Sequence, residues 1–166
     1  NLVVGAFSDD DLGPWAGSAY LFAIPQTGVG YCFGDPGSGT WCPCGNDNDG
    51  SVPGSGCANG VFPSGARMVG SGVASLGSDS VVLSTLGLEP NNSGLYFQAD
   101  NALGGGNGVV FGDGLRCAGG SLVRLIPPLM ASGKQMMLPA PVQTLDTGAV
   151  SGATRRYQYW FRTPTG

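Results

Sequence analysis

Short apolar runs separated by glycine-containing turns recur along the chain, and this pattern constrains the fold more than any other feature. In residues 109–126, the run Val109, Val110 and Phe111 is followed by a Gly-Asp-Gly turn and a second apolar run from Leu115. Two such runs around a turn that tolerates positive φ predict a hairpin, and we expect it to be central. Helices are disfavoured because 31 of the 166 residues are glycine and each interior glycine costs a helix about 1 kcal/mol.

Further strands are expected wherever apolar runs return between turn signals. After residue 60 the expected strands are 66–76, 79–86, 95–99, 109–111, 115–126, 135–138 and 155–163. We expect residues 81–83 and 122–123 to be buried, and Tyr157, Tyr159 and Phe161 to form one aromatic face by alternation. The spacing predicts an all-β fold, an antiparallel β-sandwich of the jelly-roll or immunoglobulin-like type.

Three parts of the chain differ in composition. Residues 1–27 predict an N-terminal β-hairpin, with strands at 2–7 and 18–24 around an acidic turn. Residues 28–60 hold four of the five cysteines and lack apolar periodicity, which is typical of a stapled, Gly/Pro-rich loop region. Residues 61–166 are expected to form the β-sandwich domain.

The cysteines lie among glycine, proline and serine, as expected of disulfides in an oxidising compartment. The disulfide candidates are Cys32, Cys42, Cys44, Cys57 and Cys117. An odd number leaves at least one thiol free or bonded outside this chain. Zinc is the competing interpretation, but a single C-x-C step is not the usual ligand spacing. We therefore favour disulfides and a secreted or cell-surface protein, and the start without an initiator Met is expected of a mature or excised chain.

Charge argues against a nucleic-acid partner, and the length of the apolar runs argues against a membrane span. The net charge is -4 and only Arg155 and Arg156 are adjacent basic residues, whereas nucleic-acid binding needs clustered Lys and Arg. No apolar run approaches the length of a transmembrane helix. Charged residues make up only 11% of the chain, so copies of this protein repel one another weakly. This composition favours self-association.

The first 24 residues contain two apolar strands of a recognisable kind. Leu2-Val3-Val4-Gly5-Ala6 and Gly17-Ser18-Ala19-Tyr20-Leu21-Phe22 flank an acidic loop. This arrangement resembles half of an FG-GAP repeat of the integrin-type β-propellers. A propeller blade needs four strands, so we expect either that the parent protein continues upstream or that the hairpin pairs with another sheet. The strand-donor candidates are Leu2, Val3, Val4, Ala19, Tyr20, Leu21 and Phe22.

Several turn and cysteine elements recur over residues 31–162. They are YCFGD at 31–35, CPCGN at 42–46, GCANG at 56–60, LYFQADN at 95–101, VVFGDGLRCAGG at 109–120, VRL at 123–125 and RYQYWFR at 156–162. Together they resemble a recurrent secreted bacterial domain of unassigned function. In that family a further cysteine and an apolar strand follow the RYQYWFR-like element, and neither follows here. The resemblance therefore implies a sandwich one strand short, with Cys117 or Cys32 lacking its partner.

Calcium is the one metal for which the chain offers carboxylates. Asp9, Asp10 and Asp11 could supply oxygen ligands, although a solvated turn is the preferred interpretation. The turn at residues 46–50 fails the calcium-loop pattern because Gly45 occupies the first ligand position. We expect no other cofactor.

The sequence argues against catalysis. It contains no histidine, so a serine or cysteine nucleophile would lack its usual base. Glu89, Asp100 and Asp113 are the best carboxylates for glycoside hydrolysis, yet the two aspartates occupy ordinary turn positions. We therefore expect a protein that is not an enzyme.

Two non-catalytic functions fit these observations. The first is an extracellular structural protein that self-associates by β-strand addition into a surface or filamentous assembly, for example in adhesion. The second is a secreted carbohydrate- or cell-surface-binding module from a larger propeller-containing protein. Its candidate sugar-stacking residues are Trp15, Trp41, Trp160, Tyr157 and Tyr159.

Overall fold

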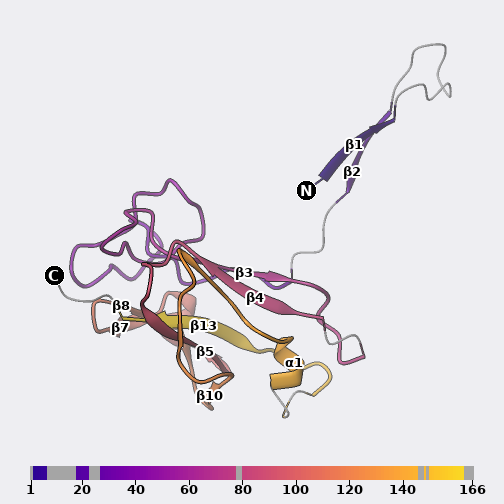
Figure 1. Cartoon of the computed structure of the whole chain (residues 1–166). Helices are drawn as coiled ribbons and strands as arrows, with labels where there is room; N and C mark the ends of the chain where they lie inside the picture. The colour runs from indigo at the N-terminus through magenta and orange to yellow at the C-terminus, as the bar shows by residue number, and fades with distance from the viewer. Residues whose placement is uncertain are drawn as a thin grey trace.

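The computed structural model describes residues 2–6, 18–22, 27–77, 80–145, 148 and 150–162. These residues form small antiparallel β-sheets (Figure 1). The helical elements described are a single turn, α1 (Val142–Leu145), and a 3-10 turn, η1 (Leu103–Gly106). No described helix is long and apolar enough to cross a bilayer. The predicted all-β, antiparallel class is confirmed.

The largest sheet is built around β5 (Ser93–Ala99). One edge of β5 pairs with β13 (Arg156–Phe161), and the other edge pairs with β10 (Val123–Arg124) and β11 (Leu129–Met130). All three pairings are antiparallel. Strand β5 is therefore central, and β13 is an edge strand.

A second sheet has three strands. Strand β4 (Val82–Leu86) lies between β3 (Arg67–Ser71) and β12 (Gln135–Met137), and both pairings are antiparallel. The predicted burial of residues 81–83 is confirmed for Val81 and Leu83, whereas Val82, which points to the other face of β4, is only partly buried. Strand β3 is an edge strand of this sheet, as β13 is of the other.

The two sheets share one hydrophobic core. Its buried members are Val81, Leu83, Leu88, Tyr96, Leu125, Ile126, Ala131, Met136, Leu138, Val142 and Tyr159. The hydroxyl of Tyr96 on β5 donates to the carbonyl of Met136 on β12 at 2.7 Å and lies 2.9 Å from the hydroxyl of Thr85 on β4. These bonds satisfy a buried polar group and tie the two sheets together. The jelly-roll or immunoglobulin-like assignment stays a prediction.

Residues 109–126 do not form the centre of the fold. Strands β7 (Val109–Phe111) and β8 (Gly114–Arg116) make a hairpin around Gly112, whose φ is 65°. All three residues of β7 are exposed, however. The prediction of a central hairpin is therefore wrong, because β7 and β8 pair only with each other among the described strands.

The predicted burial of Leu122 and Val123 is also wrong. The two side chains are 41% and 43% exposed. Strand β10 is only two residues long and lies at a sheet edge, so its apolar side chains are not covered on both faces. The neighbouring pair, β6 (Asn101–Ala102) and β9 (Ala118–Gly119), forms another small sheet.

Residues 27–66 contain no strand and are held by two disulfides. Cys42 bonds to Cys57 within this region, and Cys32 bonds to Cys117 beyond β8. The remaining thiol is that of Cys44, which is exposed. The expectation that Cys117 or Cys32 would lack a partner is therefore wrong. Gly108 allows the pairing, because a Cβ there would lie 2.5 Å from the Cys32 sulfur.

The N-terminal strands form a separate sheet. Strand β1 (Leu2–Ala6) pairs antiparallel with β2 (Ser18–Phe22), with Leu2 opposite Phe22. Figure 1 draws this hairpin apart from the other sheets. Both of its outer edges lack a partner among the described strands.

Candidate functional site

A large cleft opens between the edge strands of the two core sheets. Residues 67–70 of β3 and 156–161 of β13 line it, together with residues 27–33, and its volume is about 1220 Å³. On this side neither β3 nor β13 pairs with another described strand. The cleft is therefore bounded by two open strand edges.

The backbone of β3 presents hydrogen-bonding groups to the cleft. The carbonyl of Ala66 accepts from the amide of Gly56, and that of Gly72 accepts from the Thr27 hydroxyl, so both point away from β4. Because alternate residues of a strand point their backbone groups to the same side, those of Met68 and Gly70 also point away from β4. A further strand could pair with β3 at these two residues.

Strand β13 presents a similar edge. The amide of Arg162 donates to the carbonyl of Ser93, one residue beyond the stretch over which β13 and β5 are paired. Every second residue of β13 counted back from Arg162 therefore points its backbone groups toward β5. The backbone groups of Tyr159 and Phe161 therefore face the opposite side, toward the cleft. Each wall of the cleft therefore has unpaired strand backbone groups to which an inserted strand could form hydrogen bonds.

Aromatic side chains form one wall of the cleft. The rings of Tyr159 and Phe161 stack with centroids 6.0 Å apart, and the centroid of the Tyr96 ring lies 4.7 Å from that of Tyr159. Tyr159 is 8% exposed, and its hydroxyl has no hydrogen-bond partner among the described residues. Burial raises the pKa of Tyr159 to about 12 and likewise that of Tyr96. The predicted aromatic face of β13 therefore belongs to the core and the cleft wall.

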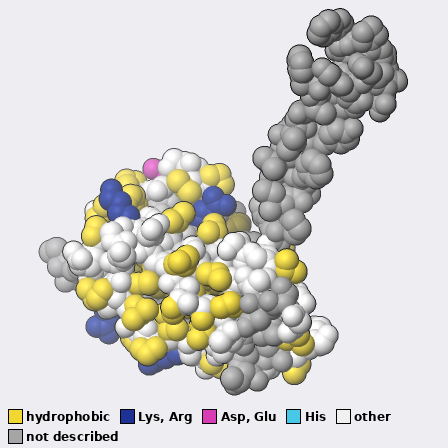
Figure 2. Space-filling view, turned by 45° about the vertical axis from the view of Figure 1, so that its right-hand side comes forward, with side chains coloured by type: hydrophobic (Ala, Val, Ile, Leu, Met, Phe, Trp, Pro, Cys, Tyr) yellow, Lys and Arg dark blue, Asp and Glu magenta, His cyan; other side chains and the backbone are white. Residues whose placement is uncertain are grey.

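The charges around the cleft are mainly positive. Arg67, Arg155 and Arg156 line it, and Asp113 is the one acidic residue among the lining residues. Arg155 forms an ion pair with Asp100 at 3.3 Å. Figure 2 shows hydrophobic side chains gathered on one face of the molecule with Lys and Arg side chains around them. An apolar segment that carries negative charge would match this cleft.

The N-terminal sequence has those properties. Residues 1–26 contain three aspartates and no Lys or Arg, whereas every basic residue of the chain lies at or after Arg67. The strand-donor candidates Leu2, Val3, Val4, Ala19, Tyr20, Leu21 and Phe22 all lie in β1 and β2. Asp9, Asp10 and Asp11 lie outside the described residues.

The carboxylates considered for catalysis are placed on separate elements with separate partners. Glu89 is buried and accepts a hydrogen bond from the Asn92 side chain at 2.7 Å. Asp100 pairs with Arg155, and Asp113 lies in the turn of the β7–β8 hairpin. Among the described residues no group of three potential metal ligands is found.

The turn at residues 46–50 uses its polar side chains within the loop. Asn48 is buried and donates to the carbonyls of Ser55 and Gly56, and Asp47 accepts from the Cys42 amide at 2.9 Å. Asp49 accepts from Ser51, and this hydrogen bond lowers the pKa of its carboxyl. These contacts account for the residue types in this turn without a metal.

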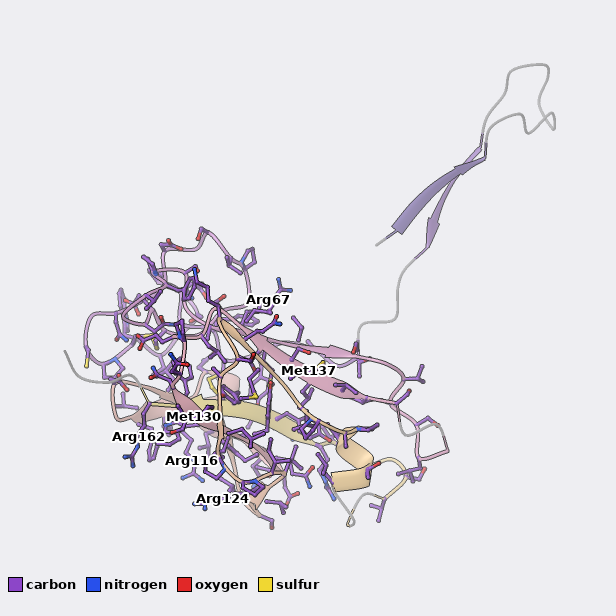
Figure 3. The ribbon with its side chains drawn as sticks, in the orientation of Figure 1. Arg67, Arg116, Arg124, Met130, Met137 and Arg162 are labelled. Carbon is purple, nitrogen blue, oxygen red and sulfur yellow. A yellow bond between two sulfur atoms is a disulfide. The ribbon has the colours of Figure 1, made fainter. Side chains whose placement is uncertain are left out.

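The tryptophans differ in accessibility. The Arg162 guanidinium lies 5.6 Å from the ring centroid of Trp160, and the Phe111 ring packs against the same side chain. Figure 3 shows Arg116, Arg124 and Arg162 on the part of the molecule that holds β8, β10 and the end of β13. Trp41 is 69% exposed, and Trp15 lies outside the described residues. Of the two described tryptophans, Trp41 is the better candidate for stacking on a ligand.

Sequence reasoning missed part of the cleft wall. It placed Met68 and Gly70 in an expected strand and Tyr31 in the YCFGD motif, but assigned none of them to a site, because the residues that complete the wall are distant in sequence. Tyr31 contributes a second buried hydroxyl with no partner among the described residues. The one sequence signal for this wall was the expectation of a missing strand, because a sheet that lacks a strand leaves strand edges unpaired.

Comparison with family models, curated proteins and solved structures finds no match to this chain. The resemblances to the FG-GAP repeat and to the secreted bacterial domain therefore stay predictions.

Proposed function

We propose that this chain is a non-catalytic extracellular structural protein whose copies associate by β-strand addition. The β1–β2 hairpin of one copy occupies the cleft between β3 and β13 of the next. The observation that carries this proposal is the apolar cleft bounded by two open strand edges. The proposal also includes a location outside the cell, with which the two disulfides are compatible.

The hairpin suits the cleft in number and length of strands. A hairpin has two outer edges, so one strand can pair with β3 while the other pairs with β13. Strands β1, β2 and β3 each have five residues, and β13 has six. An isolated two-stranded hairpin is only marginally stable in water, so insertion between two sheets would stabilise it.

Charge and symmetry favour a second copy as the partner. The three aspartates of residues 1–26 complement the arginines that line the cleft. The donor surface and the acceptor surface are different parts of one chain, so the contact is head-to-tail. A head-to-tail contact that does not close into a ring extends into a filament.

The test is the assembly state of the full chain, purified without reductant or boiling. Sedimentation velocity and negative-stain electron microscopy should reveal large assemblies, and regular filaments are expected. The double variant Val3→Asp/Leu21→Asp changes two residues that are paired in the hairpin and should abolish them. Val110→Asp is the matched control, because Val110 is 58% exposed and does not line the cleft.

Two outcomes would contradict the proposal. One is a wild-type chain that stays monomeric at every concentration, which would place its own hairpin in its own cleft or leave the cleft empty. The other is undiminished assembly of the Val3→Asp/Leu21→Asp variant. Equal loss of assembly in the Val110→Asp control would show that surface charge, rather than the hairpin, governs association.

A second candidate function is a secreted glycan-binding module, which the exposure of Trp41 favours. The ring lies next to Asp35, Gly37, Gly39 and Thr40, in the segment between Cys32 and Cys42, each of which forms a disulfide. Aromatic rings of this kind stack on the apolar faces of sugars. Quenching of tryptophan fluorescence across a glycan panel, lost in Trp41→Ala, would support it. A wild-type chain that is silent across the panel would exclude it.

A further inference from the structure

Residues 27–32 form a strap that runs from β3 toward β13 along the cleft. At its first end the Thr27 hydroxyl donates to the carbonyl of Gly72, directly after β3. The carbonyl of Thr27 also lies against Gly70, since a Cβ built there would be 2.9 Å from it. This end of the strap is thus attached at the C-terminal end of β3.

The other end of the strap is attached to β13 through a disulfide. Cys32 bonds to Cys117, whose amide donates to the side-chain oxygen of Gln158 on β13 at 2.9 Å. The Gln158 side chain also donates to the carbonyl of Leu115 at 2.8 Å, which fixes its orientation. Cys117 is therefore held on β13, and the disulfide transfers that attachment to the strap.

Between its two ends the strap has few anchors of its own. Val29 is 91% exposed and is flanked by two glycines, Gly28 and Gly30. Tyr31 is the one large side chain that packs inward, and it lies near Arg156, whose charge opposes the rise in the Tyr31 pKa caused by burial. Cys32 has a φ of 60°, a backbone conformation that residues other than glycine rarely adopt. The strap therefore depends on its attachments, of which the disulfide is the one covalent bond.

We propose that the Cys32–Cys117 disulfide is a redox-dependent brace, which holds the edges of β3 and β13 in the arrangement that accepts the hairpin of a second copy. This proposal rests on the proposed function. A cleft held open in its binding geometry loses less conformational entropy on binding, and a cross-link over this long loop restricts the alternatives most. The oxidised chain assembles, and the reduced chain does not.

The chemistry of the switch is thiol–disulfide exchange with a dithiol or its disulfide. One thiolate of a dithiol reductant attacks a sulfur of the pair, and its second thiolate resolves the mixed disulfide. Cys32 and Cys117 then carry thiols, and the reductant leaves as a cyclic disulfide. The reverse exchange with a disulfide oxidant restores the brace, so assembly would begin only after export to an oxidising compartment.

The experiment compares three full-length proteins: wild type, Cys32→Ser/Cys117→Ser, and the control Cys44→Ser, which removes the exposed free thiol. Sedimentation gives the concentration at which half of each protein is assembled. We expect the double variant to need about tenfold more protein or to stay unassembled, and the control to match wild type. Hydrogen exchange should become faster in residues 27–32 and along β3 and β13 of the double variant only.

Thr27→Val tests the same brace at its other end without touching a disulfide, so the proposal is testable even where the double variant misfolds. It should weaken assembly in the same direction by a smaller factor. Faster exchange in the strap with unchanged assembly would overturn the brace and leave the proposed function intact. Unchanged exchange in both strap variants would overturn the brace as well. A wild type that never assembles would refute the proposed function, while exchange would still report whether the disulfide holds the two edges.

Discussion

The core of this protein has two long sides, of which one is closed by the chain itself and the other is open. On one side the chain itself passes from β11 in one sheet to β12 in the other through residues 131–134. Backbone bonds secure this crossing: Ala131 donates to Asn92 at 2.9 Å, and Leu88 donates to Lys134 at 3.0 Å. On the other side β3 and β13 end in open edges around the cleft.

The difference follows from chain connectivity. A short turn closes the first side at little cost in loop entropy, because its strands are neighbours in sequence. Strands β3 and β13 are far apart in sequence, so no turn can join them, and only an added segment can pair with both edges. Under the proposed function, the open side is the part of the core that the hairpin of another chain would complete.

The largest effect is expected on the closed side. Leu138 follows β12 and is 1% exposed, so Leu138→Ala should lower the free energy of unfolding by about 3 kcal/mol through the cavity that it leaves. The neighbouring Met137 is 64% exposed, and Met137→Ala should change it by less than about 0.5 kcal/mol. Guanidinium denaturation measures both. Equal changes in the free energy of unfolding of the two variants would mean that Leu138 is not enclosed by the core.

Proline substitutions in β3 distinguish the two sides of a single strand. The amide of Val69 faces β4, so Val69→Pro should cost about 3 kcal/mol of stability. The amide of Met68 faces the cleft, so Met68→Pro should cost about 1 kcal/mol and yet prevent assembly. Denaturation and sedimentation give the two readouts. Met68→Pro chains keep the donor hairpin and Val3→Asp/Leu21→Asp chains keep the β3 edge, so a mixture of the two should form only dimers. Long assemblies in that mixture would refute the role of the β3 edge in assembly.

A smaller effect is expected at β5, which pairs with β13 on the open side and with β10 and β11 on the closed side. Gly94 is paired with Phe161, and a Cβ there would lie 2.7 Å from the Trp160 carbonyl and closer still to the Tyr159 ring. Gly94→Ala should therefore lower stability by about 2 kcal/mol, because neither β13 nor the ring can move freely. Gly114→Ala is the control, since nothing lies within 4 Å of its Cβ position. Thermal unfolding of both variants checks this, and a neutral Gly94→Ala would show that β13 shifts easily.

The smallest effect concerns alkaline pH. The pKa of Tyr159 is raised to about 12 in the folded chain, so the folded state retains a proton that the unfolded chain loses near pH 10. Stability from this group is complete below pH 10 and declines as the pH rises toward 12. Tyr159→Phe should reduce that decline, and at neutral pH it should be neutral or slightly stabilising, because the hydroxyl has no partner among the described residues. An unchanged alkaline decline, measured by denaturant titration from pH 8 to 11, would contradict this.

Prediction from sequence succeeded where the local pattern decides the outcome. The alternation of Tyr157, Tyr159 and Phe161 identified one aromatic face, because successive side chains of a strand point to opposite faces. The same reasoning failed for residues 109–126 and for Leu122 and Val123. Apolar runs indicate strands, but they do not say which neighbours will cover them.

The sequence by itself determined the all-β class, the approximate positions of strands such as β4, β5, β7 and β13, and the contrast between an acidic hairpin segment and a body that holds every basic residue. These features depend on backbone propensity and composition. The sequence did not determine that residues 115–126 divide among three short strands, or that β11 forms. Only the tertiary structure decided that Cys32 pairs with Cys117, and that β3 and β13 face each other across a cleft. Those outcomes depend on which distant segments meet, and a single sequence does not encode contacts between distant residues in its local pattern.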